Sequence, residues 1–150
     1  MGNVLYRERA DGVVIELQEF LSWWDQHGDF PLRVQVDGGL RKDASKQLHF
    51  FLSGMSKART LNETPHGPGG AVDVAPADWD GLTVTAEDYA KFCRIGVVAQ
   101  ERGLVWGGRW KKAFPPTKAN PYGGDLCHLE IEDWRALPYQ PLSTRTEEGP

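Results

Sequence analysis

The chain has 150 residues and a net charge of −4, with 40% hydrophobic and 25% charged residues. This length fits one domain with a single core, and the composition is ordinary for a soluble globular protein. The negative charge argues against a nucleic-acid-binding protein, which usually carries a basic face. No apolar run reaches the roughly 20 residues of a membrane helix, and residues 1–11 contain no apolar signal segment. We therefore expect a cytoplasmic monomer that binds neither nucleic acid nor membrane.

The first half of the chain alternates helix and strand patterns. Apolar residues at near-helical spacing predict a helix over 13–26, and alternation of apolar and polar residues predicts a strand over 32–36. Asp43 is placed to cap a second helix. The apolar face of that helix would contain Ala44, Leu48, Phe51 and Leu52. Residues 55–70 follow as a loop of a length that is typical of loops with a function.

The second half contains one helix and three short strands. We predict strands over 71–75, 104–106 and 126–131, with a loop over 111–124. Thr85 and Asp88 resemble a capping box that opens a helix closing at Gly103. Its inward residues would be Tyr89, Phe92, Cys93, Val97 and Val98.

These elements lack a regular βαβ rhythm. We therefore predict an α+β fold in which helices pack on a small, largely antiparallel sheet. Residues 1–137 would form this domain. Residues 138–150, rich in Pro, Thr and Glu, would form a flexible tail.

Two of the four histidines stand beside carboxylates at the edges of glycine-rich loops. His66 precedes Asp73 by seven residues, across Gly67-Pro68-Gly69-Gly70, a spacing that suits a loop turning back into a strand. The second segment, Asp125 to Glu130, contains His128. Nitrogen and oxygen donors converging in this way are typical zinc ligands. The sequence thus predicts a Zn²⁺ site formed by His66, Asp73 and His128.

Three protein ligands indicate a catalytic rather than a structural zinc, because they leave a fourth position for water. Zinc lowers the pKa of such a water to about 7, and a nearby carboxylate can then accept its proton. Asp125 and Glu130 are the two candidates for this base. On strict strand alternation Asp125 and His128 would face opposite sides, so Asp125 could act only from a loop or a bulge. Glu130 shares a face with His128 and could orient that ligand.

Several motifs together resemble the Hedgehog/D-Ala-D-Ala metallopeptidases, whose small phage members are L-alanyl-D-glutamate endolysins. The run from Thr64 to Asp73 is similar to the family's Ser/Thr-x-His-(x)6-Asp signature, and Asp125-x-x-His128 to its second zinc motif. His128-Leu129-Glu130 matches the family's His-aromatic/aliphatic-Glu/Gln pattern. Gly39-Leu40-Arg41 followed by Gln47 resembles the Gly-x-Arg…Gln segment, and Trp106-Gly107-Gly108 with Trp110 resembles a stretch of the endolysin branch.

The resemblance implies roles for individual residues. Asp125 would be the general base, Arg41 would contact the substrate or the developing oxyanion, and Thr64 and Glu130 would support the ligands. Arg59 is a second candidate for the role of Arg41. Trp106 and Trp110 fit the core and a substrate-binding surface equally well. We assign packing roles to the other tryptophans, Trp23, Trp24, Trp79 and Trp134. We assign structural roles to the other histidines, His27 and His49.

The cysteines carry no such role. Cys93 and Cys127 are too few for a disulfide scaffold, and we interpret them as reduced, partly buried thiols. Cys127 could supply a thiolate next to His128, but neighbouring strand residues point to opposite faces. We therefore assign Cys127 to the core.

The function that this resemblance implies is a zinc peptidase acting on the stem peptide of peptidoglycan. We expect cleavage between L-alanine and D-glutamate by a phage or prophage endolysin, kept in the cytoplasm until it is released to the cell wall. A D-Ala-D-Ala carboxypeptidase or dipeptidase is the alternative within the enzyme class. Outside that class, the same fold could serve a non-catalytic virion or wall-binding protein, which a damaged ligand set would favour.

Overall fold

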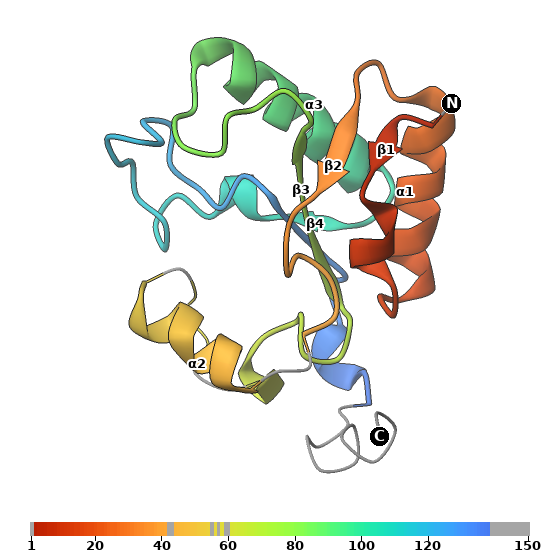
Figure 1. Ribbon diagram of the computed structural model, residues 1–150, viewed down its shortest axis with the longest axis vertical. Helices are drawn as coiled ribbons and strands as arrows, with labels where there is room; N and C mark the ends of the chain where they lie inside the picture. The colour runs from red at the N-terminus through yellow and green to blue at the C-terminus, as the bar shows by residue number, and fades with distance from the viewer. Residues whose placement is uncertain (1, 42–43, 55, 57, 59–60, 139–150) are drawn as a thin grey trace.

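Three helices and five short strands make up the computed structural model, which describes residues 2–41, 44–54, 56, 58 and 61–138 (Figure 1). The helices are α1 (Ile15–His27), α2 (Ala44–Leu52) and α3 (Ala86–Glu101). The strands are β1 (Val4–Leu5), β2 (Leu32–Val34), β3 (Ala71–Pro76), β4 (Val105–Trp106) and β5 (His128–Glu130). The predicted α+β class is confirmed, and so is the kind of every element predicted within these residues.

The five strands form one sheet in the order β1-β2-β3-β5-β4. Only the pair of β1 and β2 is parallel, and the other three pairs are antiparallel. The sheet is therefore mixed, within the largely antiparallel arrangement that we expected. In the register of β3 and β5, Asp73 lies directly opposite His128.

The core lies between the sheet and the helices α1 and α3. Its largest buried side chains include Trp24 and Phe20 of α1, Phe92 of α3 and Leu129 of β5. The predicted capping box is present, because Thr85 and Asp88 each accept a hydrogen bond from the other's backbone N–H. One inward assignment is wrong: Val97 is 41% exposed, since it lies on the solvent side of α3.

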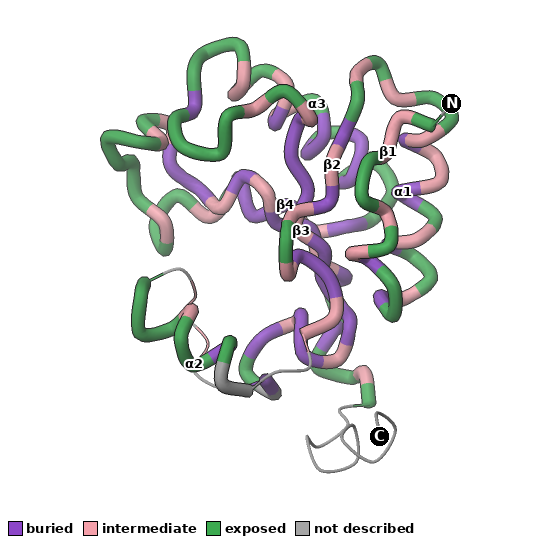
Figure 2. The backbone as a smooth tube through the Cα atoms, in the orientation of Figure 1, coloured by how far each residue is buried: buried purple, intermediate pink, exposed green. Residues whose placement is uncertain are grey.

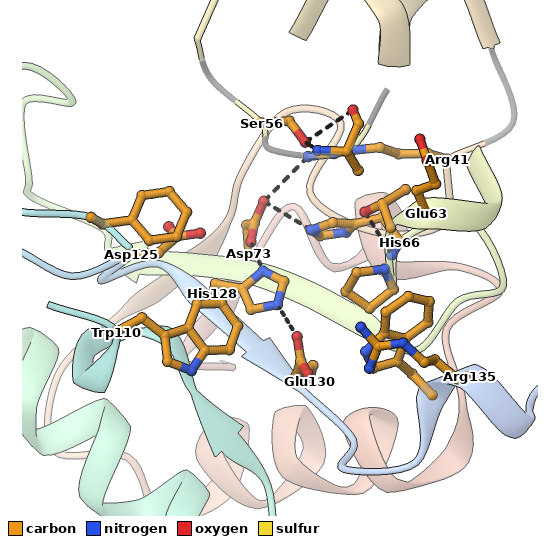
Figure 3. A pocket seen from close by; sticks show the side chains of 15 residues that line it. Arg41, Ser56, Glu63, His66, Asp73, Trp110, Asp125, His128, Glu130 and Arg135 are labelled. Carbon is orange, nitrogen blue, oxygen red and sulfur yellow. Dashed lines mark hydrogen bonds and ion pairs between the residues drawn. The ribbon is translucent and has the colours of Figure 1, made fainter. Parts of the chain in front are cut away.

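Side chains that alternate with the core residues point to the other face of the sheet. Val72 and Val74 are fully buried in the core cluster, whereas Asp73 between them faces away from it. In β5 the same alternation separates Leu129 from His128 and Glu130. This second face carries the polar groups described below, with the helices beneath the strands (Figure 3).

Helix α2 lies apart from this core, and its tube is mostly exposed (Figure 2). Its predicted apolar face does not pack inward: Leu48 is 39% exposed, Phe51 38% and Leu52 72%. The sheet residues that line the pocket, to which Arg41 and the segment after α2 also contribute, are the polar Asp73, His128 and Glu130. The predicted cap at Asp43 lies outside the described residues.

None of the helices among the described residues has the length and apolarity needed to cross a membrane. The predicted tail begins at Pro138, the last described residue, so the division at 137 stays a prediction.

Candidate metal centre and active site

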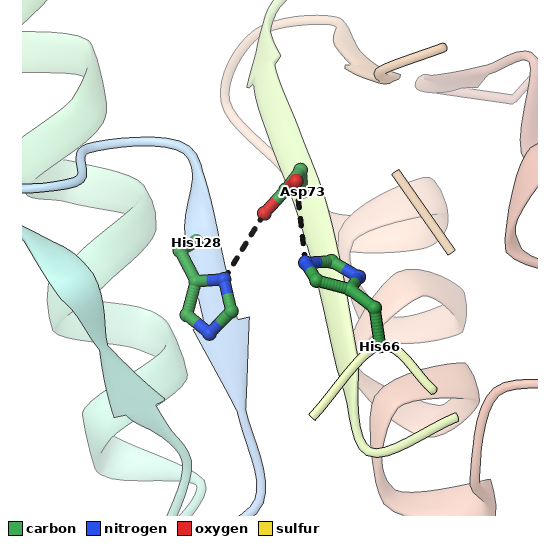
Figure 4. A group of neighbouring side chains, drawn as sticks. All are labelled: His66, Asp73 and His128. Carbon is green, nitrogen blue, oxygen red and sulfur yellow. Dashed lines mark hydrogen bonds and ion pairs between the residues drawn. The ribbon is translucent and has the colours of Figure 1, made fainter. Parts of the chain in front are cut away.

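Three separate segments bring His66, Asp73 and His128 together on the polar face of the sheet (Figure 4). Asp73 and His128 are cross-strand partners in β3 and β5. His66 comes from the turn before β3. In that turn the buried Thr64 accepts hydrogen bonds from the N–H of His66 (3.3 Å) and, through its carbonyl, from the N–H of Gly67 (3.1 Å). Thr64 thus fixes the turn that presents His66.

Two pairs of donor atoms in this group have separations close to those around a tetrahedral zinc ion. His66 Nε2 lies 3.3 Å from Asp73 Oδ2, and His128 Nδ1 lies 3.2 Å from Asp73 Oδ1. One donor atom from each residue lies within 4.8 Å of the others. Ligands at about 2.0–2.2 Å from a tetrahedral ion would be about 3.3–3.6 Å apart.

Both imidazole rings are oriented through their second nitrogen. His66 Nδ1 donates to the carbonyl of Gly39 at 3.0 Å, and His128 Nε2 donates to Glu130 Oε1 at 2.8 Å. Because these oxygens only accept, the hydrogen of each neutral ring is held there, and the lone pair of the other nitrogen points toward Asp73. Acceptors placed in this way are typical of metal-binding histidines. The donor set therefore fits a zinc ion.

The position of Gly39 depends on its missing side chain. A Cβ at this residue would lie 2.2 Å from the carbonyl oxygen of Arg9. Only glycine lets this segment approach closely enough for its carbonyl to reach His66.

The electrostatics of the site favour a positive charge at His128. Burial by itself lowers the pKa of His128, but hydrogen bonds to Asp73 and Glu130 and the charge of Asp125 raise it, to about 10. Burial lowers the pKa of His66, although Asp73 opposes this effect. Burial would raise the pKa of Asp73, and the two histidines lower it well below its usual value. The raised pKa of His128 means that a proton is held where a cation could bind, and a bound metal ion would displace that proton.

Asp125 lies in the turn before β5 and lines the same pocket as the three donor residues (Figure 3). Asp125 therefore has the loop position that a role as the base would require, because β5 begins only at His128. Its N–H donates to the carbonyl of Gly107 at 2.8 Å, and its carbonyl accepts from the N–H of His128 at 3.2 Å. Burial and the nearby charge of Asp73 raise the pKa of Asp125 to about 6.

Arg41 enters the pocket from the opposite side. Its side-chain Nη2 lies 3.6 Å from Asp73 Oδ2. Its backbone N–H donates to the carbonyl of His66 at 2.9 Å. Burial lowers the pKa of this guanidinium, and the neighbouring carboxylates oppose the shift. Arg41 thus lies beside a predicted metal ligand. Arg59, the second candidate for its role, lies outside the described residues.

The pocket has a volume of about 350 Å³ and is bounded by aromatic side chains. The ring of Trp110 lies 5.1 Å from that of His128, and Phe114 stacks beside Trp110 at 6.3 Å. Trp106 instead lies in the core, where its Nε1 donates to the carbonyl of Leu126. The two tryptophans that the sequence left open therefore have different surroundings.

The remaining candidates make packing contacts, and none of them belongs to the donor group. His27 packs against Trp23, and His49 against Phe50. Cys127 packs against the core, and burial raises the pKa of its thiol. Trp134 packs in the core and also lines the pocket, next to Arg135.

Two residues in or beside the pocket, Arg135 and Gln47, were not assigned a role of their own from the sequence. Arg135 has no pattern that distinguishes it from a surface charge. Gln47 follows Arg41 by six residues, and its burial beside the exposed Leu48, Phe51 and Leu52 is visible only in three dimensions.

Comparison with known proteins confirms the resemblance that the motifs indicated. The model of the D-alanyl-D-alanine carboxypeptidase family matches residues 58–118, which include His66 and Asp73 and end before Asp125 and His128. The chain is also similar in structure to the L-Ala D-Glu endopeptidase ChiX of Serratia marcescens. That likeness has a TM-score of 0.59 and 24% sequence identity over 87% of this chain and 90% of the other, and it shows a shared fold. A comparison with curated proteins gives no match.

Proposed function

We propose that this protein is a zinc-dependent peptidase that hydrolyses a peptide bond in the stem peptide of bacterial peptidoglycan. The observation that carries the proposal is the donor group of His66, Asp73 and His128, which shares one pocket with Asp125 and Arg41. The family match and the ChiX-like fold support a peptidase of this kind. A damaged ligand set would have favoured a non-catalytic protein, whereas all three predicted ligand residues lie together in the pocket.

His66, Asp73 and His128 would hold the metal, with Glu130 and the carbonyl of Gly39 fixing the two rings. Bound zinc would supply Lewis-acid chemistry, activating a water and polarising the scissile carbonyl. Asp125 would accept a proton from the attacking water and return it to the leaving amine. Arg41 would bind an anionic group of the substrate or the developing oxyanion, because its guanidinium is permanently charged and planar.

Two bonds are candidates for cleavage. The likeness to ChiX over most of both chains favours an L-alanyl-D-glutamate endopeptidase. The family model favours the alternative, release of a terminal D-alanine by a carboxypeptidase or dipeptidase. We propose the endopeptidase, in the context of phage or prophage lysis.

Digestion of purified peptidoglycan with the zinc-loaded protein distinguishes these possibilities. Mass spectrometry of the products would show new L-alanine carboxyl termini for the endopeptidase and free D-alanine for the carboxypeptidase. The variant Asp125→Asn serves as the control for contaminating hydrolases. Intact peptidoglycan after treatment with fully zinc-loaded protein would contradict the proposed function.

A further inference from the structure

Helix α2 buries a polar side chain and exposes apolar ones. Gln47 is 0% exposed, whereas Leu48, Phe51 and Leu52 on the same helix are each more than a third exposed. A buried amide is unfavourable unless its hydrogen-bonding groups are satisfied. The partners of Gln47 therefore reveal how α2 is attached to the site.

The amide of Gln47 joins Arg41 to one wall of the pocket. Its Oε1 accepts a hydrogen bond from Arg41 Nη1 at 3.0 Å. Its Nε2 donates to Ser56 Oγ at 3.0 Å and to the carbonyl of Ala58 at 2.7 Å. Ser56 and Ala58 both line the pocket. One side chain thus fixes the guanidinium and the wall relative to each other.

Other contacts of Arg41 show why the bond to Gln47 matters. Arg41 Nε donates to the carbonyl of Asp37 at 3.2 Å, and the guanidinium carbon lies 4.8 Å from the ring centroid of Phe50 in α2. A guanidinium is a rigid planar fork. Fixing Nε and Nη1 therefore determines the direction of Nη2, which faces Asp73.

We propose that Gln47 is a positioning residue that sets the orientation of Arg41 for substrate binding. This inference rests on the role of Arg41 in the proposed function. It also gives a function to α2, whose residues Leu48, Phe51 and Leu52 do not complete the core. Removing the amide leaves Nη1 of Arg41 without this acceptor, so that the guanidinium turns more freely.

A double-mutant cycle tests the coupling of the two residues. Gln47→Met keeps the length of the side chain and removes its hydrogen bonds. It should lower kcat/KM by about tenfold or more, the scale of a lost hydrogen bond to a charged group. Combined with Arg41→Lys it should add little, because both variants remove the same interaction. The matched control is Gln100→Leu, which breaks a glutamine–arginine pair with Arg109 outside the pocket and should leave kcat/KM unchanged.

A second variant separates the role toward Arg41 from the role toward the wall. Gln47→Glu keeps an acceptor for Arg41 and loses the donor to Ala58. It should retain most of the activity, whereas a role confined to the wall predicts the same loss as for Gln47→Met. Melting temperature and zinc content are measured for every variant. If Gln47→Met does not fold, loss of activity or fast rotation of the Arg41 guanidinium in Gln47→Glu would overturn the inference.

Nitrogen-15 NMR of the Arg41 guanidinium gives a readout that does not depend on activity. Rotation of the Nη groups should be slow in the wild type and in Gln47→Glu, and fast in Gln47→Met. Unchanged rotation in Gln47→Met, together with independent losses in the cycle, would overturn the inference. If the wild type cleaves no peptidoglycan, the proposed function fails, and the NMR comparison still decides the role of Gln47.

Discussion

The body formed by α1, α3 and the sheet contrasts with α2 in how it distributes polarity. In the body, large apolar side chains such as Trp24 and Phe92 are fully buried. Among the described side chains of α2, the amide of Gln47 is buried, whereas Leu48, Phe51 and Leu52 are each more than a third exposed. The body therefore supplies the free energy of folding, mainly through apolar burial. Helix α2 contributes hydrogen bonds to the pocket instead. Both regions contribute to the site: the sheet carries the predicted ligands Asp73 and His128, and α2 carries the amide that binds Arg41.

The metal ligands depend on the body and should show the largest effect. His66→Ala and His128→Ala each remove one of three donors, so we expect loss of zinc and of all hydrolysis. Metal analysis of the purified variants measures their zinc content, and release of stem peptides from peptidoglycan measures hydrolysis. His27→Ala, whose ring lies against Trp23 away from the pocket, is the matched control and should keep its zinc. Full zinc occupancy in both ligand variants would disprove the assignment.

The two carboxylates beside the metal ligands should differ. Asp125→Asn keeps the size of the side chain and removes the proton acceptor, so turnover should fall by about 10²–10⁴-fold. Glu130→Gln keeps an oxygen that can accept from His128 Nε2 at its present 2.8 Å and should cost less. Both variants should bind zinc. The reverse ranking of turnover at full zinc occupancy would transfer the role of base to Glu130.

Stability measurements test the contrast between the body and α2 directly. Trp24→Ala removes a fully buried side chain and its hydrogen bond to the carbonyl of Phe30, so the free energy of unfolding should fall by about 3–5 kcal/mol. Phe51→Ala removes an aromatic ring that is 38% exposed on α2, and it should cost about 1 kcal/mol or less. Denaturant unfolding measures both. Equal losses would show that α2 belongs to the cooperative core.

Substitution of Arg41, which lies between the body and α2, should have a smaller effect on catalysis. Arg41→Lys keeps the charge but loses the planar fork that reaches both Gln47 and Asp73, so we expect a loss of about 1.5–3 kcal/mol in transition-state binding. Steady-state kinetics on a stem peptide measures this loss. Arg109→Lys, outside the pocket, is the control. Wild-type rates for Arg41→Lys at normal zinc content would exclude the proposed anchor and leave Arg59 as the candidate.

Much of the fold could be predicted because periodicity reports on one-sided burial. The helices and all strands except β1 follow from apolar spacing, whereas Val4–Leu5 is too short to show a period. The same reasoning failed for the face of α2, because periodicity shows that residues share a face but not whether an apolar surface covers it. Val97 was wrongly predicted to face inward for the same reason, because its apolar spacing does not show that it is covered.

Part of the candidate site could likewise be predicted from the sequence, and part could not. Glycine-rich loops beside His66 and His128 indicated where donors could converge, and the structure brings them together with Asp73. The hydrogen bond between Gln47 and Arg41 could not be predicted, because it depends on how α2 is oriented in space. The loop position of Asp125 likewise depends on β5 starting at His128 rather than at Leu126.

Because Asp73 pairs with His128, the geometry of the candidate metal centre depends on the register of β3 and β5. Side chains alternate with a period of two, so a slip of β5 by one residue would place Leu129 opposite Asp73 and turn both His128 and Glu130 into the apolar layer. Insertions in the loop over 111–124 should leave this register unchanged, because loops tolerate changes in length. A single residue inserted between His128 and Glu130 would separate the imidazole from the carboxylate that orients it. Length variation is therefore tolerable on one side of Asp125 and disruptive on the other.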